Sequence, residues 1–233
     1  MKALVLLTAF ALAACTHVHQ ASVQYRVDHA LTVRLERPWA DTSRRASPRL
    51  SKHVHLLSIH GAALESLYLV GGLKPGNPLL TPPHGDEYPR YRADFSRSEI
   101  VEFVNASLAA LGYVGVSPRN IRPAALASQD AVRFDIDMQT VDGLDVSGTA
   151  LAGQSGDRLD LILFLAPREH FYPALMPEID RMLIAAASGL VRWPLSSTDD
   201  CKLGLCRSIP EAVANSSVRK TDIQGPQITA CGR

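Results

Sequence analysis

Apolar and polar residues alternate along several stretches of the chain, and a period of two is typical of strands with one buried face. The first such stretch occupies residues 25–35, and two apolar runs of strand length follow at residues 54–59 and 64–70. Gly61 lies between the last two as a turn residue, and Gly71-Gly72 is expected to end the second. The N-terminal third is therefore predicted to form a three-stranded meander.

The clearest helix signal follows a Pro- and Gly-rich excursion over residues 74–91. Ser96-Arg97-Ser98-Glu99 is a capping box, in which the serine hydroxyl accepts from a free amide and the glutamate reaches back. Apolar residues then recur at helical spacing, at Ile100, Phe103, Val104, Leu108 and Leu111. Gly112 supplies the C-terminal stop.

A second run of strands begins where four apolar residues alternate with polar ones over residues 132–139. Asp142-Gly143 is a strong hairpin signal, which makes residues 144–150 the return strand. Residues 159–166 are almost continuously apolar, as expected for the most central strand. Pro173 and Pro177 precede a second helix, predicted over roughly residues 178–187.

The predicted order is three strands, helix, three strands, helix. Strands that come in runs, rather than in alternation with helices, favour an α+β fold with a largely antiparallel sheet. We therefore predict about six strands with both helices packed on the sheet, within a domain spanning residues 23–188. Residues 189–233 form an irregular tail that contains cysteines.

The first fourteen residues have the pattern of an export signal. Lys2 gives a positive start, and the stretch from Ala3 to Ala14 is apolar apart from Thr8. This stretch is shorter than the roughly 20 apolar residues that a permanent membrane-spanning helix needs. It is typical of a secretory signal peptide, so residues 1–14 are predicted to be a leader. A plain signal peptide followed by an incidental cysteine, or an uncleaved anchor helix, is the alternative.

The end of this leader, Leu12-Ala13-Ala14-Cys15, resembles the lipobox of bacterial lipoproteins. The resemblance implies cleavage before Cys15 and acylation of both its sulfur and its new amino group (a palmitate-type lipid anchor). Residues 15–22 would then be a tether between the lipid and the fold. Thr16 stands where enteric-type lipoproteins retained in the inner membrane carry aspartate. The resemblance therefore implies the periplasmic face of the outer membrane.

The element order, the Asp142-Gly143 hairpin and Ala166-Pro167 after the central strand resemble the PsbP-like fold, which includes the DcrB-like lipoproteins. The resemblance covers roughly residues 25–188. Members of this fold are mostly non-catalytic binding or assembly factors. The resemblance therefore implies a binding role with an envelope protein as partner, without naming a ligand.

The charge balance excludes one class of partner. The 233 residues carry 24 Lys and Arg against 23 Asp and Glu, so the chain lacks the basic surface of a nucleic-acid binder. It contains no phosphate-binding glycine loop and no common nucleophile motif, and no cofactor is expected.

The tail carries Cys201, Cys206 and Cys231. An oxidising compartment favours a disulfide, and one disulfide among three cysteines leaves one thiol unpaired. The sequence leaves two kinds of pairing open, Cys201 with Cys206 or either of them with Cys231; the alternative is that all three are reduced. The Cys201–Cys206 spacing is unlike that of a zinc site.

Histidines and aspartates offer two further hypotheses. His53 and His55 share one face of a predicted strand, and His60 and His84 lie on neighbouring loops, but a metal site needs three or four convergent ligands. No metal site is therefore predicted. The aspartates of the second run of strands (Asp135, Asp137, Asp142 and Asp145) could form an acid–base pair, but their alternation with apolar residues favours a solvated face.

One loop is a candidate binding patch: His170, Phe171 and Tyr172 follow the central strand, where binding residues often gather. The alternative is that the two aromatic rings pack under the second helix. The favoured hypothesis is a lipid-anchored periplasmic binding or envelope-assembly factor without catalytic activity. The competing hypothesis is a small periplasmic hydrolase or metal-dependent enzyme whose site combines His53, His55, Asp135 or His170.

Overall fold

A computed structural model describes residues 19–28, 31–43, 50–80 and 88–188. The strands in this part of the chain are β1 (His19–Gln20), β2 (Gln24–Arg26), β3 (Thr32–Arg34), β4 (Ala40–Asp41), β5 (Val54–Ser58), β6 (Ser66–Leu73), β7 (Val114–Leu126), β8 (Gln129–Gln139), β9 (Asp145–Ser155) and β10 (Arg158–Pro167). The two long helices are α3 (Arg97–Ala110) and α4 (Phe171–Ala187).

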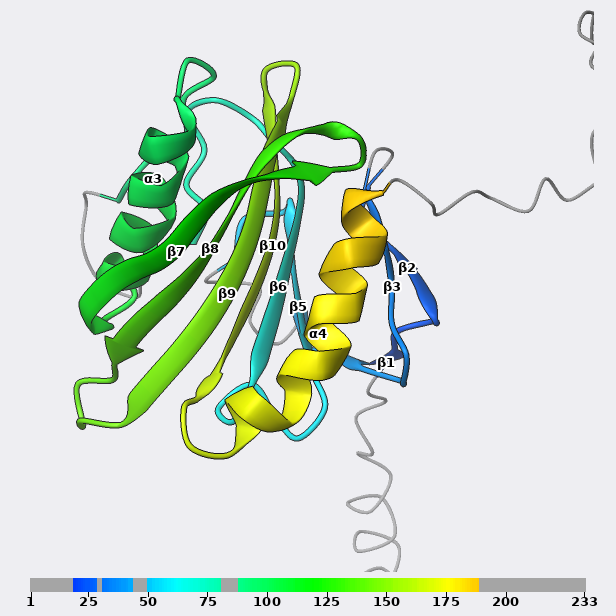
Figure 1. Cartoon of the computed structure of the whole chain (residues 1–233), viewed down its shortest axis with the longest axis vertical. Coiled ribbons are helices and arrows are strands. Elements are labelled where there is room, and N and C mark those ends of the chain that lie inside the picture. Colours follow the sequence, from blue (N-terminus) through cyan, green and yellow to red (C-terminus); the bar gives the residue numbers. More distant parts are fainter. Residues whose placement is uncertain (1–18, 29–30, 44–49, 81–87, 189–233) are drawn as a thin grey trace, which may run out of the picture. The chain divides into compact units, whose positions relative to one another are not determined.

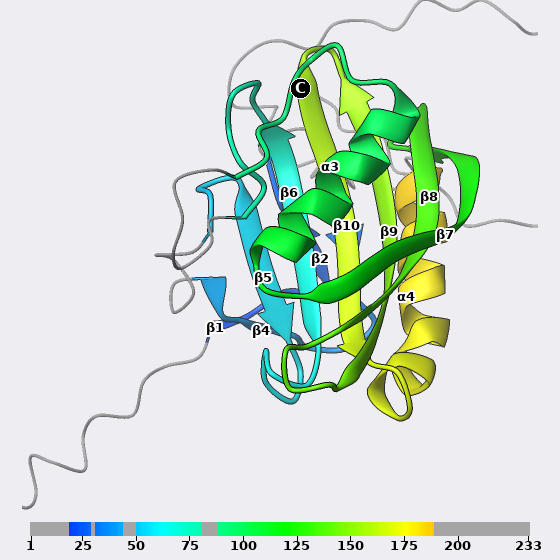
Figure 2. The same ribbon diagram turned by 90° about the vertical axis from the view of Figure 1, so that its left-hand side faces the viewer.

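Eight of these strands form one sheet in the order β1-β4-β5-β6-β10-β9-β8-β7, with every neighbouring pair antiparallel. β2 and β3 form a separate antiparallel pair. α3 lies on one face of the large sheet, and α4 lies on the other beside β2 and β3 (Figure 1, Figure 2). The predicted α+β class with a largely antiparallel sheet is confirmed.

Alternation along the central strands divides the core between the two faces of the sheet. On β10, Leu161 and Leu163 point into the core under α3, whereas Ile162 and Phe164 point into the core under α4. This explains the almost continuous apolar run of this strand, because both of its faces are covered. Within the described residues the core under α4 also contains Trp39, which is 1% exposed.

α3 begins and ends where its sequence predicts. Ser96 is the N-cap: its Oγ accepts from the backbone N–H of Glu99, and Glu99 Oε2 accepts from the backbone N–H of Ser96. Gly112 follows the helix with φ +100°, a conformation that favours glycine.

The N-terminal third differs from the predicted meander. Its first expected strand is two short strands, β2 and β3, which pair with each other rather than with β5. Residues 19–22, expected to end the tether, belong to the fold. His19 and Gln20 pair with β4, and the backbone N–H of Ala21 donates to the carbonyl of Trp39 at 2.7 Å.

Gly71-Gly72 does not end β6, which continues to Leu73. These two glycines stand opposite the single residue Asp160 in a β-bulge, and the N–H of Gly72 donates to Asp160 Oδ1 at 2.7 Å. A Cβ on Gly71 would lie 2.8 Å from Asp28 Cγ, and Gly72 has φ +62°. Here glycine permits a close approach and a bulge, not a chain reversal.

The second half contains one strand that the prediction missed and one helix that it shortened. β7 is a 13-residue edge strand that carries Pro118 and Pro123. α4 begins at Phe171, seven residues before the predicted start, with Pro177 inside it. The remaining three strands, β8, β9 and β10, lie where the sequence predicts them.

Candidate functional site

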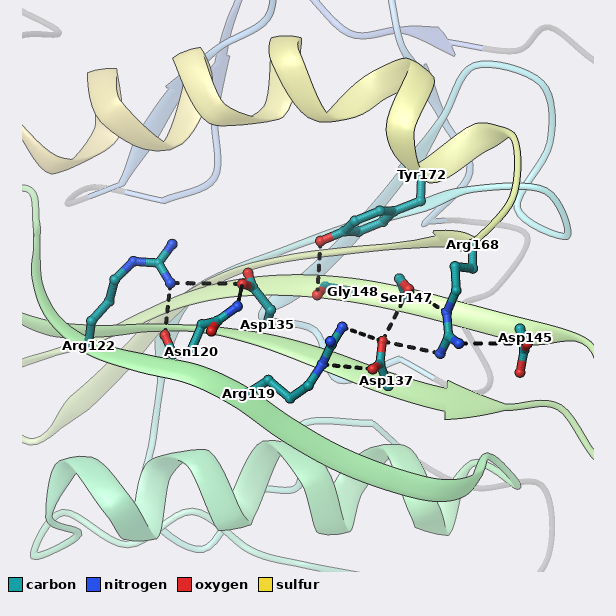
Figure 3. Close-up of polar contacts among 10 residues, drawn as sticks. All are labelled: Arg119, Asn120, Arg122, Asp135, Asp137, Asp145, Ser147, Gly148, Arg168 and Tyr172. Carbon is teal, nitrogen blue, oxygen red and sulfur yellow. Dashed lines mark hydrogen bonds and ion pairs between the residues drawn. The ribbon is translucent and has the colours of Figure 1, made fainter.

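A network of charged and polar side chains covers the face of β7, β8 and β9 that looks toward α4 (Figure 3). Alternation along β8 produces it: Phe134, Ile136 and Met138 are buried under α3, so Asp135 and Asp137 project from the opposite face. Their carboxylates are 21% and 24% exposed, so this face is only partly solvated.

Asp137 is held by two guanidinium groups. Arg119 on β7 contacts it with two nitrogens, each at 2.7 Å, and Arg168 after β10 lies 3.2 Å from Oδ1. Ser147 Oγ also donates to Oδ1 at 3.3 Å. Arg168 continues to Asp145, with 3.7 Å between Nη1 and Oδ2. The network therefore ties the edge strand β7 to β8, β9 and the end of β10.

Asp135 has a similar set of donors. Thr149 Oγ1 donates to Oδ1 at 3.0 Å, Asn120 Nδ2 donates to Oδ2 at 2.9 Å, and Arg122 Nη1 lies 3.8 Å from Oδ2. Asn120 adopts φ +50°, a conformation that asparagine tolerates better than most residues. Arg122 Nη1 also donates to the carbonyl of Asn120 at 2.8 Å.

Tyr172 connects this network to α4. Its hydroxyl donates to the carbonyl of Gly148 at 3.2 Å, and its ring stacks on Phe164 with centroids 5.9 Å apart. Burial, with a contribution from the negative charges of Asp135 and Asp180, raises the pKa of Tyr172 to about 12. Tyr172 is therefore a neutral donor at physiological pH.

The expected loop patch is thus the start of a helix. His170 is the N-cap of α4 without a side-chain capping bond, and the ring of Phe171 lies 5.0 Å from that of His170 and 5.5 Å from that of His60. Of the three residues of the patch, only Tyr172 reaches the polar network, and both aromatic rings are partly buried against the core under α4.

The network is electrically balanced. Arg119, Arg122 and Arg168 face Asp135, Asp137 and Asp145, three cations against three anions. A carboxylate that is occupied by guanidinium and hydroxyl donors is poorly placed to accept a proton from a substrate. The arrangement is suited to holding strands together rather than to acid–base chemistry.

The structure does not assemble the residues of the enzyme hypothesis. His55 lies on β5 and Asp135 on β8, and three strands separate them in the sheet, which amounts to about 19 Å at about 4.8 Å per strand. His53 precedes β5, and His170 caps α4. Among the described residues, no hydrogen bond or ion pair joins any two of these four side chains. They do not form one site.

His55 has other partners, which the sequence did not indicate. Its Nδ1 lies 2.8 Å from the hydroxyl of Tyr25, and this hydroxyl donates to Asp41 Oδ2 at 2.8 Å. Burial and the Asp41 carboxylate raise the pKa of Tyr25. The tyrosine hydroxyl gives its one hydrogen to Asp41, so its oxygen can only accept from His55. The hydrogen of this second bond therefore belongs to His55 Nδ1. These contacts join β2 to β4 and β5.

Metal-binding residues do not converge in the described ranges, where no group of three His, Cys, Asp or Glu side chains could hold an ion. His53 Nε2 is buried without a hydrogen-bond partner, and burial lowers the pKa of this imidazole. His60 contacts the buried Glu65 at 3.3 Å. His84 and the cysteines Cys15, Cys201, Cys206 and Cys231 lie outside the described residues.

An apolar pocket of about 380 Å³ lies on the other face of the sheet, at its β5–β6 side. α3 packs chiefly against β7 and β8, whereas Leu56 of β5 and Tyr68 of β6, which are direct cross-strand partners, line the hollow. Its lining consists of Leu50, Leu56, Tyr68, Leu80, Leu111, Gly112, Tyr113, Thr140 and Val141. None of these residues is charged. Sequence reasoning missed this pocket because its lining comes from six separate stretches of the chain.

The polar side chains among the lining residues are those of Tyr68, Tyr113 and Thr140. Burial raises the pKa of Tyr68 to about 12 and also raises that of Tyr113. Both hydroxyls are therefore neutral at physiological pH and could each donate one hydrogen bond to a ligand. The pocket can hold an uncharged apolar molecule with a hydrogen-bond acceptor.

Comparisons with known proteins add no assignment: no protein-family model matches the sequence, and neither a curated protein nor a solved structure is significantly similar to it. Within the described ranges, no helix combines the length and the apolar character that crossing a bilayer requires.

Proposed function

We propose that this chain is a lipid-anchored protein of the bacterial envelope that binds an uncharged apolar ligand and catalyses no reaction. The anchor is Cys15, acylated after removal of residues 1–14, and the location is the periplasmic face of the outer membrane. The lipobox sequence supports the anchor, and the pocket beside Tyr68 supports the binding role.

The observation that carries the binding role is the contrast between the two faces of the sheet. Among the described residues of the network on β7, β8 and β9, each of the three arginines pairs with an aspartate, so this network has no unpaired guanidinium group for a substrate anion. On the other face, the pocket has a volume within the usual range of small-molecule sites, about 300–1,000 Å³. Apolar walls with a few polar groups are typical of such sites.

The lining also restricts the charge of the ligand. A carboxylate or ammonium group placed among Leu56, Leu80 and Tyr68 would lose its hydration without gaining a counter-ion. An alkyl or aromatic group that ends in a hydroxyl, ester or carbonyl avoids this cost, because the tyrosine hydroxyls can donate to it. This role agrees with the binding and assembly factors of the PsbP-like fold, which the element order resembles, and the proposed partner is an envelope protein that delivers or receives the ligand.

Photolabelling tests the binding role. The full-length protein in lipid nanodiscs is illuminated with a diazirine-bearing alkyl alcohol, and 1-dodecanol and dodecylammonium are added as competitors. The proposal predicts saturable labelling that the alcohol suppresses and the ammonium does not. Labelling that does not saturate, or that both competitors suppress equally, would contradict it.

A matched pair of variants controls for non-specific labelling. Val141 lines the pocket and is 75% exposed, so Val141→Asp adds a charge at the rim without disturbing the core. Ile121 on β7 is 55% exposed and lies outside the pocket, which makes Ile121→Asp the control. Labelling should fall in the first variant and persist in the second.

The anchor has its own test. Cys15→Ser should release the protein from the membrane fraction after cell lysis, and mass spectrometry of the mature wild-type N-terminus should find an acylated cysteine. Continued membrane attachment of the variant, or an intact leader on the wild type, would refute the anchor.

A further inference from the structure

A second hollow, of about 450 Å³, lies between β3 and α4. One of its lining residues, Val23, follows the proposed anchor Cys15 by only eight positions in the sequence. Apolar side chains of Val23, Leu35 and Met182 line the hollow, together with Arg34, Glu36 and Arg181. Val23 is 57% exposed, and Ile184, one helical turn beyond Arg181, is 63% exposed. Exposed apolar and basic groups thus lie side by side on the surface formed by Val23, Arg34, Arg181, Ile184 and Ala185, here called the α4–β3 surface.

The charge of this surface is positive. Glu36 accepts from both the Nε and the Nη2 of Arg181, with 2.7 Å for the second contact, and the charges of Arg37 and Arg34 also act on it. This leaves two guanidinium groups for one carboxylate around the hollow, a net charge of +1. Exposed apolar side chains gain from burial in the interface of a bilayer, and a basic residue near an anionic lipid surface adds about 1 kcal/mol.

The length of the chain restricts what can cover this surface. Four residue steps separate Cys15 from His19, the first residue of β1, and they span at most about 14 Å. Four more steps lead to Val23, whose carbonyl accepts from the backbone N–H of Leu35 at 2.8 Å and is therefore fixed to the fold. An acylated Cys15 would keep the body within this short distance of the lipid headgroups.

We infer that the α4–β3 surface rests on the bilayer that holds the acyl chains, with Val23 and Ile184 in the interface and Arg34 at the phosphate of an anionic phospholipid. This inference rests on the proposed lipid anchor. It does not depend on the apolar pocket, whose lining residues come from other parts of the fold. Docking would hold the body in one orientation on the membrane instead of leaving it to rotate about its tether.

Tryptophan quenching in proteoliposomes tests the inference. The full-length acylated protein, as Ile184→Trp, is reconstituted into phosphatidylcholine vesicles with or without phosphatidylglycerol, and the phosphatidylcholine is brominated in its acyl chains. Ile121→Trp is the matched control, because Ile121 is similarly exposed, at 55% against 63% for Ile184, and lines neither the apolar pocket nor the α4–β3 surface. Wild-type protein supplies the background emission of the native tryptophans.

The inference predicts stronger quenching of Ile184→Trp than of Ile121→Trp, and an increase when phosphatidylglycerol is present. Adding Arg34→Gln to Ile184→Trp should lower the docked-to-undocked ratio about fivefold, since one basic residue near an anionic surface contributes about 1 kcal/mol. Equal quenching at both positions in protein that floats with the vesicles would overturn the docking alone. Protein that fails to float would overturn the anchor, and the docking with it.

Discussion

The indole N–H of Trp39 donates to Oε1 of Glu178 over 3.1 Å and so joins two residues that are 139 positions apart in the chain. Both side chains are buried, and Arg37 Nε lies 2.6 Å from the second carboxylate oxygen of Glu178. The N-terminal segment and α4 thus share one buried charge.

Removing this charge should destabilise the fold. Glu178→Ala leaves the Trp39 N–H without its acceptor and Arg37 without its ion pair, so the free energy of unfolding should fall by about 2–4 kcal/mol. Urea denaturation, followed by the fluorescence of Trp39, measures this loss. Glu169→Ala, at an exposed position just before α4, is the control and should change stability by less than about 0.5 kcal/mol. Equal effects in both variants would mean that the buried contact contributes little.

The polar network on β7, β8 and β9 should behave as a structural unit. Asp137→Asn keeps the shape of the side chain but removes the negative charge that pairs with Arg119 and Arg168, so we expect a loss of about 1–3 kcal/mol in unfolding free energy. Asp142→Asn, in the exposed hairpin turn, is the matched control. The difference between the two variants should shrink as salt concentration rises, because the network is partly exposed. A difference that does not respond to salt would argue against an electrostatic origin.

Asp160 should make the protein less stable as pH rises. Burial raises its pKa to about 6 from an ordinary value of 3.8, so between these values the folded state keeps a proton that the unfolded state has released. The stabilisation from this group is therefore complete below about pH 4 and is lost as the pH rises to about 6, by an amount on the order of 3 kcal/mol.

Asp160→Asn removes this pH dependence while its amide oxygen can still accept the N–H of Gly72. The variant should match the wild type near pH 4 and exceed it in stability at pH 7.5, as measured by thermal or urea unfolding at both values. A variant that is less stable than the wild type at pH 7.5 would show that the charged carboxylate stabilises the bulge.

The prolines of β7 should protect the edge of the sheet. Pro118 and Pro123 lack the N–H that a further strand would need, and the positive φ of Asn120 interrupts the strand between them. The double variant Pro118→Val, Pro123→Val should therefore associate at concentrations where the wild type does not, as measured by sedimentation velocity. Unchanged sedimentation would mean that Asn120 and the side chains of this strand are sufficient protection.

The same features explain what sequence reasoning missed. The regular alternation over residues 132–139 and the capping box at Ser96 predicted β8 and α3, because in both cases local pattern and burial agree. β7 carries two prolines and is mostly exposed, so it gives no alternating pattern, and pairing with β8 alone makes it a strand. Pro177 suggested a helix start, yet packing of Leu175 and Tyr172 against the core extends α4 past it to Phe171.

The candidate sites were less predictable than the fold. Asp135 and Asp137 were correctly placed on the face opposite the apolar residues, but their arginine partners come from β7 and from the end of β10. The apolar pocket is lined by residues from six separate stretches, which only the assembled layers bring together.

The position of a bound ligand tests the central claim most directly. After photolabelling of the full-length protein in nanodiscs with the diazirine-bearing alkyl alcohol, peptide mass spectrometry locates the label. The account predicts labels on Leu56, Tyr68, Leu80, Tyr113 or Val141, the residues that line the pocket. Labels confined to the α4–β3 surface, or spread evenly over the chain, would contradict it.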